Sequence, residues 1–319
     1  MRVFRFAFVL VLALVALGAT ARADDATTAV YNQAKALFDA QKFREAIAVL
    51  DPAIVAHPQS AKLAALRGDA HYELDEYQQA LIDYNSAIAI NSDYESAYES
   101  RCWTENMLSD YKAGAADCAK ALTLDPKDDA AYRGHGRALY YLNRDEEAVA
   151  DFTHAIALSS TTPSSYSFRC DTYRDLKQYD KAVADCTKAL ALDPSYSFAY
   201  FNRGRTYIGM QQWAQAIADL KAFVKANPDD TGGNYWLAKA QFLNHDYAAA
   251  LANINVYVKV NVDDADGYLL RAGINTGLGK TQAAIDDATV ALRHYRIAND
   301  EDGAANAQQL LTTLQTAKP

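Results

Sequence analysis

Apolar and small residues recur with a period of 34 along this 319-residue chain, from residue 27 to residue 298. In each 34-residue frame, positions 4, 8 and 11 form one helical stripe, and positions 20, 24 and 27 form a second. Small residues at positions 8 and 20 let two helix backbones approach closely, and larger residues at positions 4, 17 and 24 fill the remaining space. Each frame is therefore expected to fold as two helices of about 14 residues joined by a tight turn.

The frames follow one another without insertion or deletion, and position 20 is alanine or glycine in all eight. Proline at position 32 of four frames should stop the second helix, because the residue before proline disfavours helix. An array of this kind leaves an apolar face at its end, so residues 303–316 are predicted to form a capping helix. The predicted repeats cover residues 27–60, 61–94, 95–128, 129–162, 163–196, 197–230, 231–264 and 265–298.

This pattern resembles the tetratricopeptide repeat, with Leu124-Asp125-Pro126 and Leu192-Asp193-Pro194 as typical repeat ends. The resemblance covers residues 27–298. It implies an all-α fold, a right-handed α-solenoid of eight 34-residue helix-turn-helix repeats plus a C-terminal capping helix. It also implies a protein–protein interaction scaffold or peptide-binding module that holds its partner in a concave groove.

The first 23 residues are expected to be a secretory signal peptide, which leaves residues 24–319 as the repeat domain. Arg2 and Arg5 precede an apolar run over residues 6–17, and Ala21-Arg22-Ala23 supplies small residues before the cleavage point. Cleavage after Ala21 and an uncleaved anchor are the alternatives, although twelve apolar residues are short for a membrane span. Export predicts a periplasmic protein, with no membrane span after cleavage.

The chain is acidic, with 31 basic and 40 acidic side chains and a formal charge of −9. Loss of Arg2, Arg5 and Arg22 with the signal peptide would leave 28 basic side chains and a charge of −12. A general nucleic-acid binder is excluded, because phosphate neutralisation needs a surplus of lysine and arginine.

The four cysteines occupy positions 8 and 24 of repeats three and five. These positions face each other in a helical hairpin that turns near positions 15–17. In an oxidising compartment we expect the disulfides Cys102–Cys118 and Cys170–Cys186. Four reduced core cysteines are the alternative.

Positions 7 and 23 carry a second pairing, because every repeat with arginine at position 7 has aspartate at position 23. Pairing with the preceding repeat instead would serve only three of the five arginines. Repeat four places His135 opposite Asp151. The expected structural ion pairs are Arg67–Asp83, Arg101–Asp117, Arg169–Asp185, Arg203–Asp219 and Arg271–Asp287.

No motif indicates catalysis, a cofactor or a metal site. Gly277-Leu278-Gly279-Lys280-Thr281 lacks the glycine that a phosphate-binding loop needs at position 274, and it falls at the turn of repeat eight. The six histidines show no metal-binding spacing, and no nucleophile has a supporting base. We therefore expect a protein that is not an enzyme; a composite site assembled across repeats is the alternative.

By resemblance, positions 2, 5, 9 and 12 of the first helices face the groove. In repeats three to seven these positions gather cations and aromatic rings, which favours an extended peptide that is acidic or contains aromatic residues. Asp69 and Asp171 interrupt the basic strip. A structural subunit of a fixed cell-envelope assembly is the alternative. The candidate groove residues are Trp103, Arg133, Arg137, Tyr140, Arg174, Phe198, Phe201, Arg205, Tyr235, Lys239 and Phe242.

Overall fold

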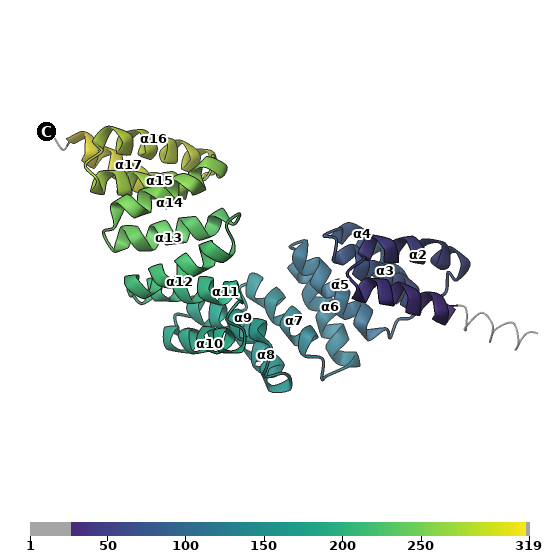
Figure 1. Ribbon diagram of the computed structural model, residues 1–319. Coiled ribbons are helices and arrows are strands. Elements are labelled where there is room, and N and C mark those ends of the chain that lie inside the picture. The colour runs from purple at the N-terminus through teal and green to yellow at the C-terminus, as the bar shows by residue number, and fades with distance from the viewer. Residues whose placement is uncertain (1–26, 317–319) are drawn as a thin grey trace, which may run out of the picture. The chain divides into compact units, whose positions relative to one another are not determined.

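A computed structural model describes residues 27–316, and every regular element in this part of the chain is an α-helix (Figure 1). Residues 27–39 are helical, and further helices follow in close succession to residue 316. The expected signal peptide lies outside the described residues. In residues 27–316, no helix combines the length and apolar character that a membrane crossing requires.

The helices group into two compact units, Met1–Ser159 and Ser160–Pro319. Unit one contains α2 (Phe43–Ala56), α3 (Ala61–Tyr72), α4 (Tyr77–Ile90), α5 (Glu95–Met107), α6 (Tyr111–Leu124), α7 (Asp129–Tyr141) and α8 (Asp145–Leu158). Unit two contains α9 (Pro163–Asp175), α10 (Tyr179–Leu192), α11 (Ser197–Gly209), α12 (Trp213–Ala226), α13 (Thr231–Leu243), α14 (Tyr247–Val260), α15 (Ala265–Gly277), α16 (Thr281–Ile297) and α17 (Glu301–Thr316).

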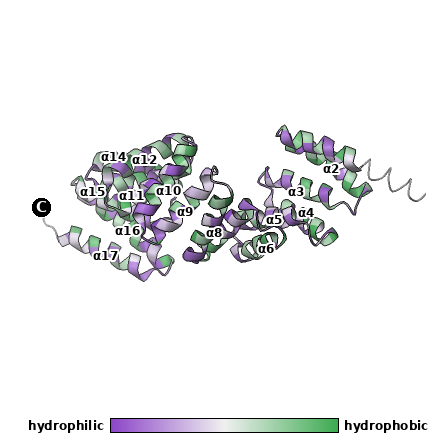
Figure 2. Ribbon diagram, turned by 90° about the horizontal axis from the view of Figure 1, so that it is seen from below, coloured by the Kyte–Doolittle hydropathy of each residue, from purple (hydrophilic) through white to green (hydrophobic). Residues whose placement is uncertain are grey.

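Within each unit, every helix packs against its neighbours in the chain, and successive first helices of the repeats also touch. The helices carry hydrophilic and hydrophobic residues interspersed along their length (Figure 2), as amphipathic helices do. The predicted all-α fold of repeated helical hairpins with a final capping helix is confirmed.

Positions 8 and 24 meet at the centre of each hairpin, which explains the small residue at position 8. A Cβ atom on Gly68 would lie 2.7 Å from the Tyr84 ring, and one on Gly204 would lie 2.7 Å from Leu220 Cγ. Tyr84 and Leu220 are fully buried. Glycine at position 8 therefore makes room for a large side chain on the second helix.

The capping helix α17 begins at Glu301, two residues before the predicted start, and ends at Thr316 as expected. Its Ala307 and Leu311 pack with Tyr295 of α16 in one buried cluster. A Cβ atom on Gly303 would overlap the Tyr295 ring, so the two helices are in direct contact there. The last repeat thus has its apolar face covered.

The turn inside each hairpin uses one residue in the left-handed region at position 15. In repeat five, Lys177 N–H donates to the Arg174 carbonyl at 2.9 Å, and Gln178 N–H donates to the Tyr173 carbonyl at 2.8 Å. These bonds satisfy the last carbonyls of α9. The left-handed residues are Gln41, Asp75, Ser109, Asn143, Lys177, Gln211, His245 and Gly279, together with Asn299 before α17.

We expect Lys177→Gly to raise the free energy of unfolding by roughly 0.5–1 kcal/mol, because a residue with a Cβ atom is strained at its φ of 57°. Gly279→Ala should have the opposite effect, since Gly279 has a φ of 69° at the equivalent position. Urea denaturation of both variants checks the pair. A less stable Lys177→Gly variant would contradict this account of the turn.

Candidate functional site

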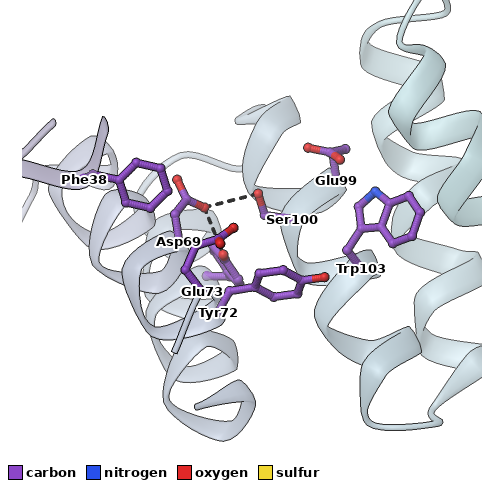
Figure 3. Close-up of a pocket in the computed structure, with 8 residues that line it drawn as sticks. Phe38, Asp69, Tyr72, Glu73, Glu99, Ser100 and Trp103 are labelled. Atoms are coloured by element: carbon purple, nitrogen blue, oxygen red, sulfur yellow. Dashed lines mark hydrogen bonds between the residues drawn. The ribbon is translucent and has the colours of Figure 1, made fainter. Parts of the chain in front are cut away.

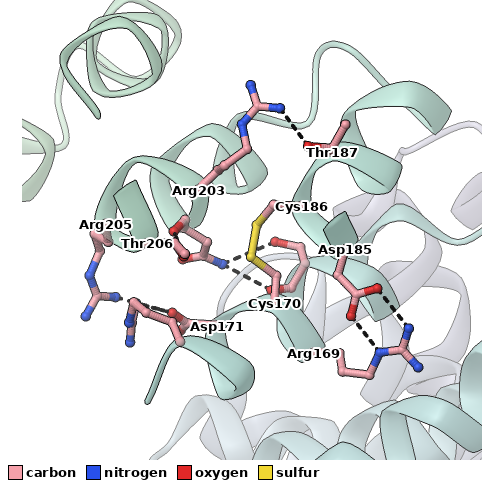
Figure 4. Close-up of a disulfide and its surroundings, with 12 residues drawn as sticks. Arg169, Cys170, Asp171, Asp185, Cys186, Thr187, Arg203, Arg205 and Thr206 are labelled. Carbon is pink, nitrogen blue, oxygen red and sulfur yellow. Dashed lines mark hydrogen bonds and ion pairs between the residues drawn. A yellow bond between two sulfur atoms is a disulfide. The ribbon is translucent and has the colours of Figure 1, made fainter. Parts of the chain in front are cut away.

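Both expected disulfides are present, one in each unit. Cys102 on α5 is bonded to Cys118 on α6, with Cα atoms 5.4 Å apart, and Cys170 on α9 is bonded to Cys186 on α10, with Cα atoms 5.5 Å apart (Figure 4). All four cysteines are completely buried. The disulfides therefore lie in the hairpin core and not on a binding face.

The five expected arginine–aspartate pairs also form, each through two hydrogen bonds. Arg203 donates to Asp219 from Nε at 2.7 Å and from Nη2 at 2.9 Å, and Arg169 does the same to Asp185 (Figure 4). The five aspartates are buried, with 3–8% of their surface exposed. Hydrogen bonding to Asp219 raises the pKa of Arg203. The aspartates of these pairs are therefore engaged inside the hairpins, while the arginine side chains keep 16–25% of their surface exposed.

A third arginine contact was not predicted, because the preceding repeat was considered only as an alternative to the pair within the repeat and not as an additional partner. In repeats two, three, six and eight, the arginine Nη1 also reaches position 25 of the preceding second helix, so each of these arginines joins three helices. Repeat four differs, and His135 Nδ1 lies 2.6 Å from Asp151. The additional contacts are Arg67–Asp51 at 2.8 Å, Arg101–Asn85 at 2.5 Å, Arg203–Thr187 at 3.1 Å and Arg271–Asn255 at 3.1 Å.

In unit two, the first helices α11 and α13 place two cations against one indole ring. The Arg205 guanidinium lies 4.7 Å from the centre of the Trp236 ring, and Lys239 Nζ lies 4.9 Å from it. The two cations also contact Phe201 and Tyr235 at 5.3 and 6.0 Å. We call these five half-buried residues the cation–aromatic surface.

The other candidates in unit two are engaged within the protein to different degrees. Arg174 is only 9% exposed and is ion-paired with Asp171 and Asp175, so its predicted groove contact is corrected. Asp171 also lies 3.5 Å from Arg205 (Figure 4). Phe198 is 53% exposed, whereas Phe242 packs on the core of its own hairpin.

In unit one, the three candidates on α7 do not form a free basic strip. Arg133 is ion-paired with Asp129 at 2.5 Å. The Arg137 guanidinium lies 5.9 Å from the Tyr141 ring, and Tyr140 packs edge-on against the same ring. The structure therefore leaves less unpaired positive charge here than the sequence suggested.

Trp103, the remaining candidate, lines an acidic pocket instead of a basic one (Figure 3). The pocket has a cavity volume of about 280 Å³ and lies between the helical residues 27–39 and helices α3, α4 and α5. We call it the acidic–aromatic pocket. Its lining residues are Phe38, Asp69, Tyr72, Glu73, Tyr84, Glu99, Ser100 and Trp103.

Two carboxyl groups of this pocket hold protons more tightly than usual. Burial raises the pKa of Asp69 to about 6, although hydrogen bonds from Tyr84 and Ser100 oppose the increase. Burial raises the pKa of Glu99 to about 7, and the negative charges of Asp128, Glu95 and Asp69 add to it. Both groups therefore titrate close to neutral pH.

Sequence reasoning missed most of this pocket, although the signal was present. Phe38, Asp69, Tyr72 and Glu99 occupy positions 12, 9, 12 and 5 of repeats one to three, which are groove positions by resemblance. The basic strip was expected over repeats three to seven, with Asp69 as an interruption and not as part of a site. Trp236 was missed because it stands at position 6.

In the described residues, histidine, cysteine, aspartate and glutamate side chains form no group of three suited to a metal ion. Gly279 of the glycine-rich segment lies in the turn between α15 and α16. Gly279 N–H donates to the Thr276 carbonyl and Lys280 N–H donates to the Asn275 carbonyl, which is the backbone pattern of the turn in repeat five.

Models of the tetratricopeptide repeat match three stretches of the sequence, residues 31–95, 163–196 and 201–259. No curated protein sequence matches this chain. The family matches fall in both compact units.

Several solved structures have a similar fold at low sequence identity. A chain of the Cut9–Hcn1 hetero-tetramer of APC/C is 15% identical with a TM-score of 0.71, and the match covers 89% of this chain and 55% of that one. This chain thus spans about half the length of that relative. PilW, a type IV pilus biogenesis factor, is 23% identical with a TM-score of 0.59, over 70% of this chain and 98% of that one. PilF of Pseudomonas aeruginosa is 16% identical with a TM-score of 0.58, over 67% and 96%.

Proposed function

Because this chain is a tetratricopeptide repeat protein, we propose that it is a non-catalytic scaffold that binds a protein or peptide partner. The fold supports this role, since stacked helical hairpins present extended surfaces for recognition. Two proteins of similar fold support this role, because Cut9–Hcn1 is a hetero-tetramer and PilW is a pilus biogenesis factor. The fold by itself does not define the partner.

The observation that carries a more specific proposal is the cation–aromatic surface of unit two. Arg205 and Lys239 both lie within 5 Å of the Trp236 ring centre, at 4.7 and 4.9 Å. Lys239 contacts rings and has no ion pair with a carboxylate in residues 27–316. Aromatic rings supply desolvated anchors, and cations select an anionic partner. We therefore propose that this surface binds an extended peptide with acidic and aromatic residues.

We also propose that the protein acts in an oxidising compartment, the bacterial periplasm. The two buried disulfides support this placement, because such bonds persist outside the reducing cytosol. The N-terminal sequence pattern of a signal peptide is the second support. Cell fractionation, with the N-terminal residue of the mature chain determined by mass spectrometry, tests both.

The binding proposal predicts that Lys239→Glu weakens retention of acidic peptides by about tenfold or more. Lys239 is preferred to Arg205 because Arg205 already lies beside Asp171. The matched control is Lys221→Glu, which makes the same charge change at an exposed site on α12. A pull-down from a peptide library, with melting curves for each variant, measures the effect.

Equal retention by both variants and the wild type would contradict a role for the cation–aromatic surface. Co-purification from envelope extracts would then identify the alternative function. One stoichiometric partner would favour a fixed structural subunit, whereas many substoichiometric partners would favour a peptide receptor that uses another face.

A further inference from the structure

The acidic–aromatic pocket of unit one has the opposite charge to the cation–aromatic surface of unit two. Three carboxyl groups line it, those of Asp69, Glu73 and Glu99, and no lysine or arginine does. The pocket is a defined cavity of about 280 Å³ between helices. It is therefore a recess within unit one and not merely a run of acidic surface residues.

Asp69 and Glu99 each have at least one carboxyl oxygen that accepts no hydrogen bond from the described residues. Glu99 makes no hydrogen bond or ion pair with the described residues. Asp69 receives both of its hydrogen bonds at Oδ1, from Tyr84 at 2.9 Å and from Ser100 at 3.3 Å (Figure 3). These two bonds hold Asp69 in place and leave Oδ2 for a donor on a ligand.

Aromatic rings make up most of the remaining wall. Phe38, Tyr72 and Trp103 come from three successive repeats and line the same cavity (Figure 3). Ring faces attract cations, and their apolar surface suits the methylene chain that carries a terminal charge. Carboxylates beside aromatic rings thus match a long side chain with a cationic end.

We propose that the acidic–aromatic pocket binds the ammonium or guanidinium group of a lysine or arginine side chain on a peptide partner. The positive group would donate hydrogen bonds to Glu99 and to Asp69 Oδ2, while the side-chain stem packs against the rings. This proposal does not depend on the cation–aromatic surface, which lies in the other unit and selects the opposite charge.

The proton affinity of the pocket gives the binding a characteristic pH dependence. A cation favours the ionised carboxylate, so binding must displace a proton wherever the carboxyl group is protonated. With the pKa of Glu99 raised to about 7, protonation of Glu99 alone should lower the affinity roughly 30-fold between about pH 8 and about pH 5.5, and protonation of Asp69 should add to that loss. The charged groups that act on Glu99 are Asp128, Glu95, Asp69 and Arg133, and Glu73 and Lys35 act on Asp69.

Protonation of Asp69 and Glu99 does not unfold the chain, so acid unfolding through these groups cannot account for a loss of cation affinity at low pH. A carboxyl group whose folded-state pKa is raised stabilises the fold when protonated, and that contribution is lost as the pH rises through the raised pKa. At about pH 5.5 these groups therefore favour the folded chain. Weaker binding there would report on the charge of the pocket.

The test is calorimetric titration of the full chain with capped pentapeptides whose central residue is arginine, lysine, glutamine or glutamate. We expect the arginine and lysine peptides to bind at least about tenfold more tightly than the glutamine peptide at about pH 8. Free arginine amide and spermidine form a further arm. Tighter binding of the peptides identifies a peptide side chain, and equal binding identifies a small amine with the same chemistry.

Glu99→Gln should reduce the affinity for the arginine peptide at least about tenfold and flatten its pH dependence. The matched control, Glu146→Gln, makes the same change at an exposed site of unit one and should leave both unchanged. Asp69→Asn provides a second variant, and melting curves monitor folding. Equal affinity for the arginine and glutamine peptides, or unchanged binding by folded Glu99→Gln, overturns the proposal.

Lys239→Glu separates this proposal from the proposed function. We expect it to leave the arginine-peptide titration unchanged while it weakens the binding of acidic peptides. If the acidic peptides fail to bind and the arginine peptide still binds in a Glu99-dependent way, only the proposed function of unit two fails.

Discussion

Loss of either disulfide should lower the free energy of unfolding of its unit by about 3 kcal/mol, on the chain-entropy estimate for a loop of this size. Each bond joins residues 16 apart in the sequence, across one helical hairpin. Because contacts in a repeat array are made between near neighbours, the effect should remain local. Cys102–Cys118 should matter to unit one, and Cys170–Cys186 to unit two.

The chain itself offers a matched replacement for a disulfide. Repeat eight has Ala272 and Ala288 at positions 8 and 24, and both are completely buried. The double variant Cys102→Ala and Cys118→Ala reproduces that pair in repeat three, so it should fold without leaving a buried thiol. The loss of stability then reflects the missing covalent bond together with the atoms removed.

Denaturant unfolding with and without reductant measures the loss. Hydrogen exchange should show faster opening of α5 and α6 in the alanine variant, and no change in α9 and α10. Peptide mapping without reduction should recover Cys102 joined to Cys118. Recovery of Cys102 joined to Cys170 or Cys186, or equal stability with and without reductant, would contradict the assignment.

Contacts set by the 34-residue period could be predicted from the sequence. Position 8 meets position 24 and position 7 meets position 23 in the same hairpin, so a separation of 16 residues identifies both partners. The third contacts, such as Arg203 with Thr187, also span 16 residues, but toward the preceding repeat. They were missed because the residue type at position 25 varies.

The candidate binding residues were harder to predict, because a groove position does not fix what its side chain does. Arg174 was expected to face a ligand, but it forms ion pairs with Asp171 and Asp175 on its own helix. The Phe201 ring lies 4.7 Å from that of Phe223, so part of its surface serves the core. The repeat pattern runs unchanged through Ser159, so it carries no sign of the division into two units.

Asp219→Ala should destabilise unit two by roughly 2–4 kcal/mol, closer to the cost of breaking a buried ion pair than an exposed one. The Asp219 side chain is only 9% exposed and the Arg203 side chain 18%. The variant removes both hydrogen bonds to Asp219 and leaves the guanidinium with Thr187 and the rings of Tyr200 and Tyr207. The disulfides lie in repeats three and five, so no covalent bond within repeat six masks the loss.

Repeat seven shows how the pair can be replaced as a unit. It has Leu237 and Asn253 at positions 7 and 23, where Leu237 is buried and Asn253 donates to Gln241 at 2.7 Å. We therefore expect Arg203→Leu combined with Asp219→Asn to cost less than Asp219→Ala alone. Replacing both partners avoids an underpaired buried charge, whereas removing one partner creates it.

A thermodynamic cycle from denaturant unfolding measures this coupling between Arg203 and Asp219. Glu147→Ala is the control, because the Arg144–Glu147 pair lies on the surface with side chains 50% and 59% exposed. We expect no measurable loss from that change, since water and salt screen an exposed pair. If Asp219→Ala were as harmless as Glu147→Ala, the arginine–aspartate pairs would not stabilise the array. If the double variant were the least stable, Arg203 would contribute mainly through its ring contacts and its bond to Thr187, independently of Asp219.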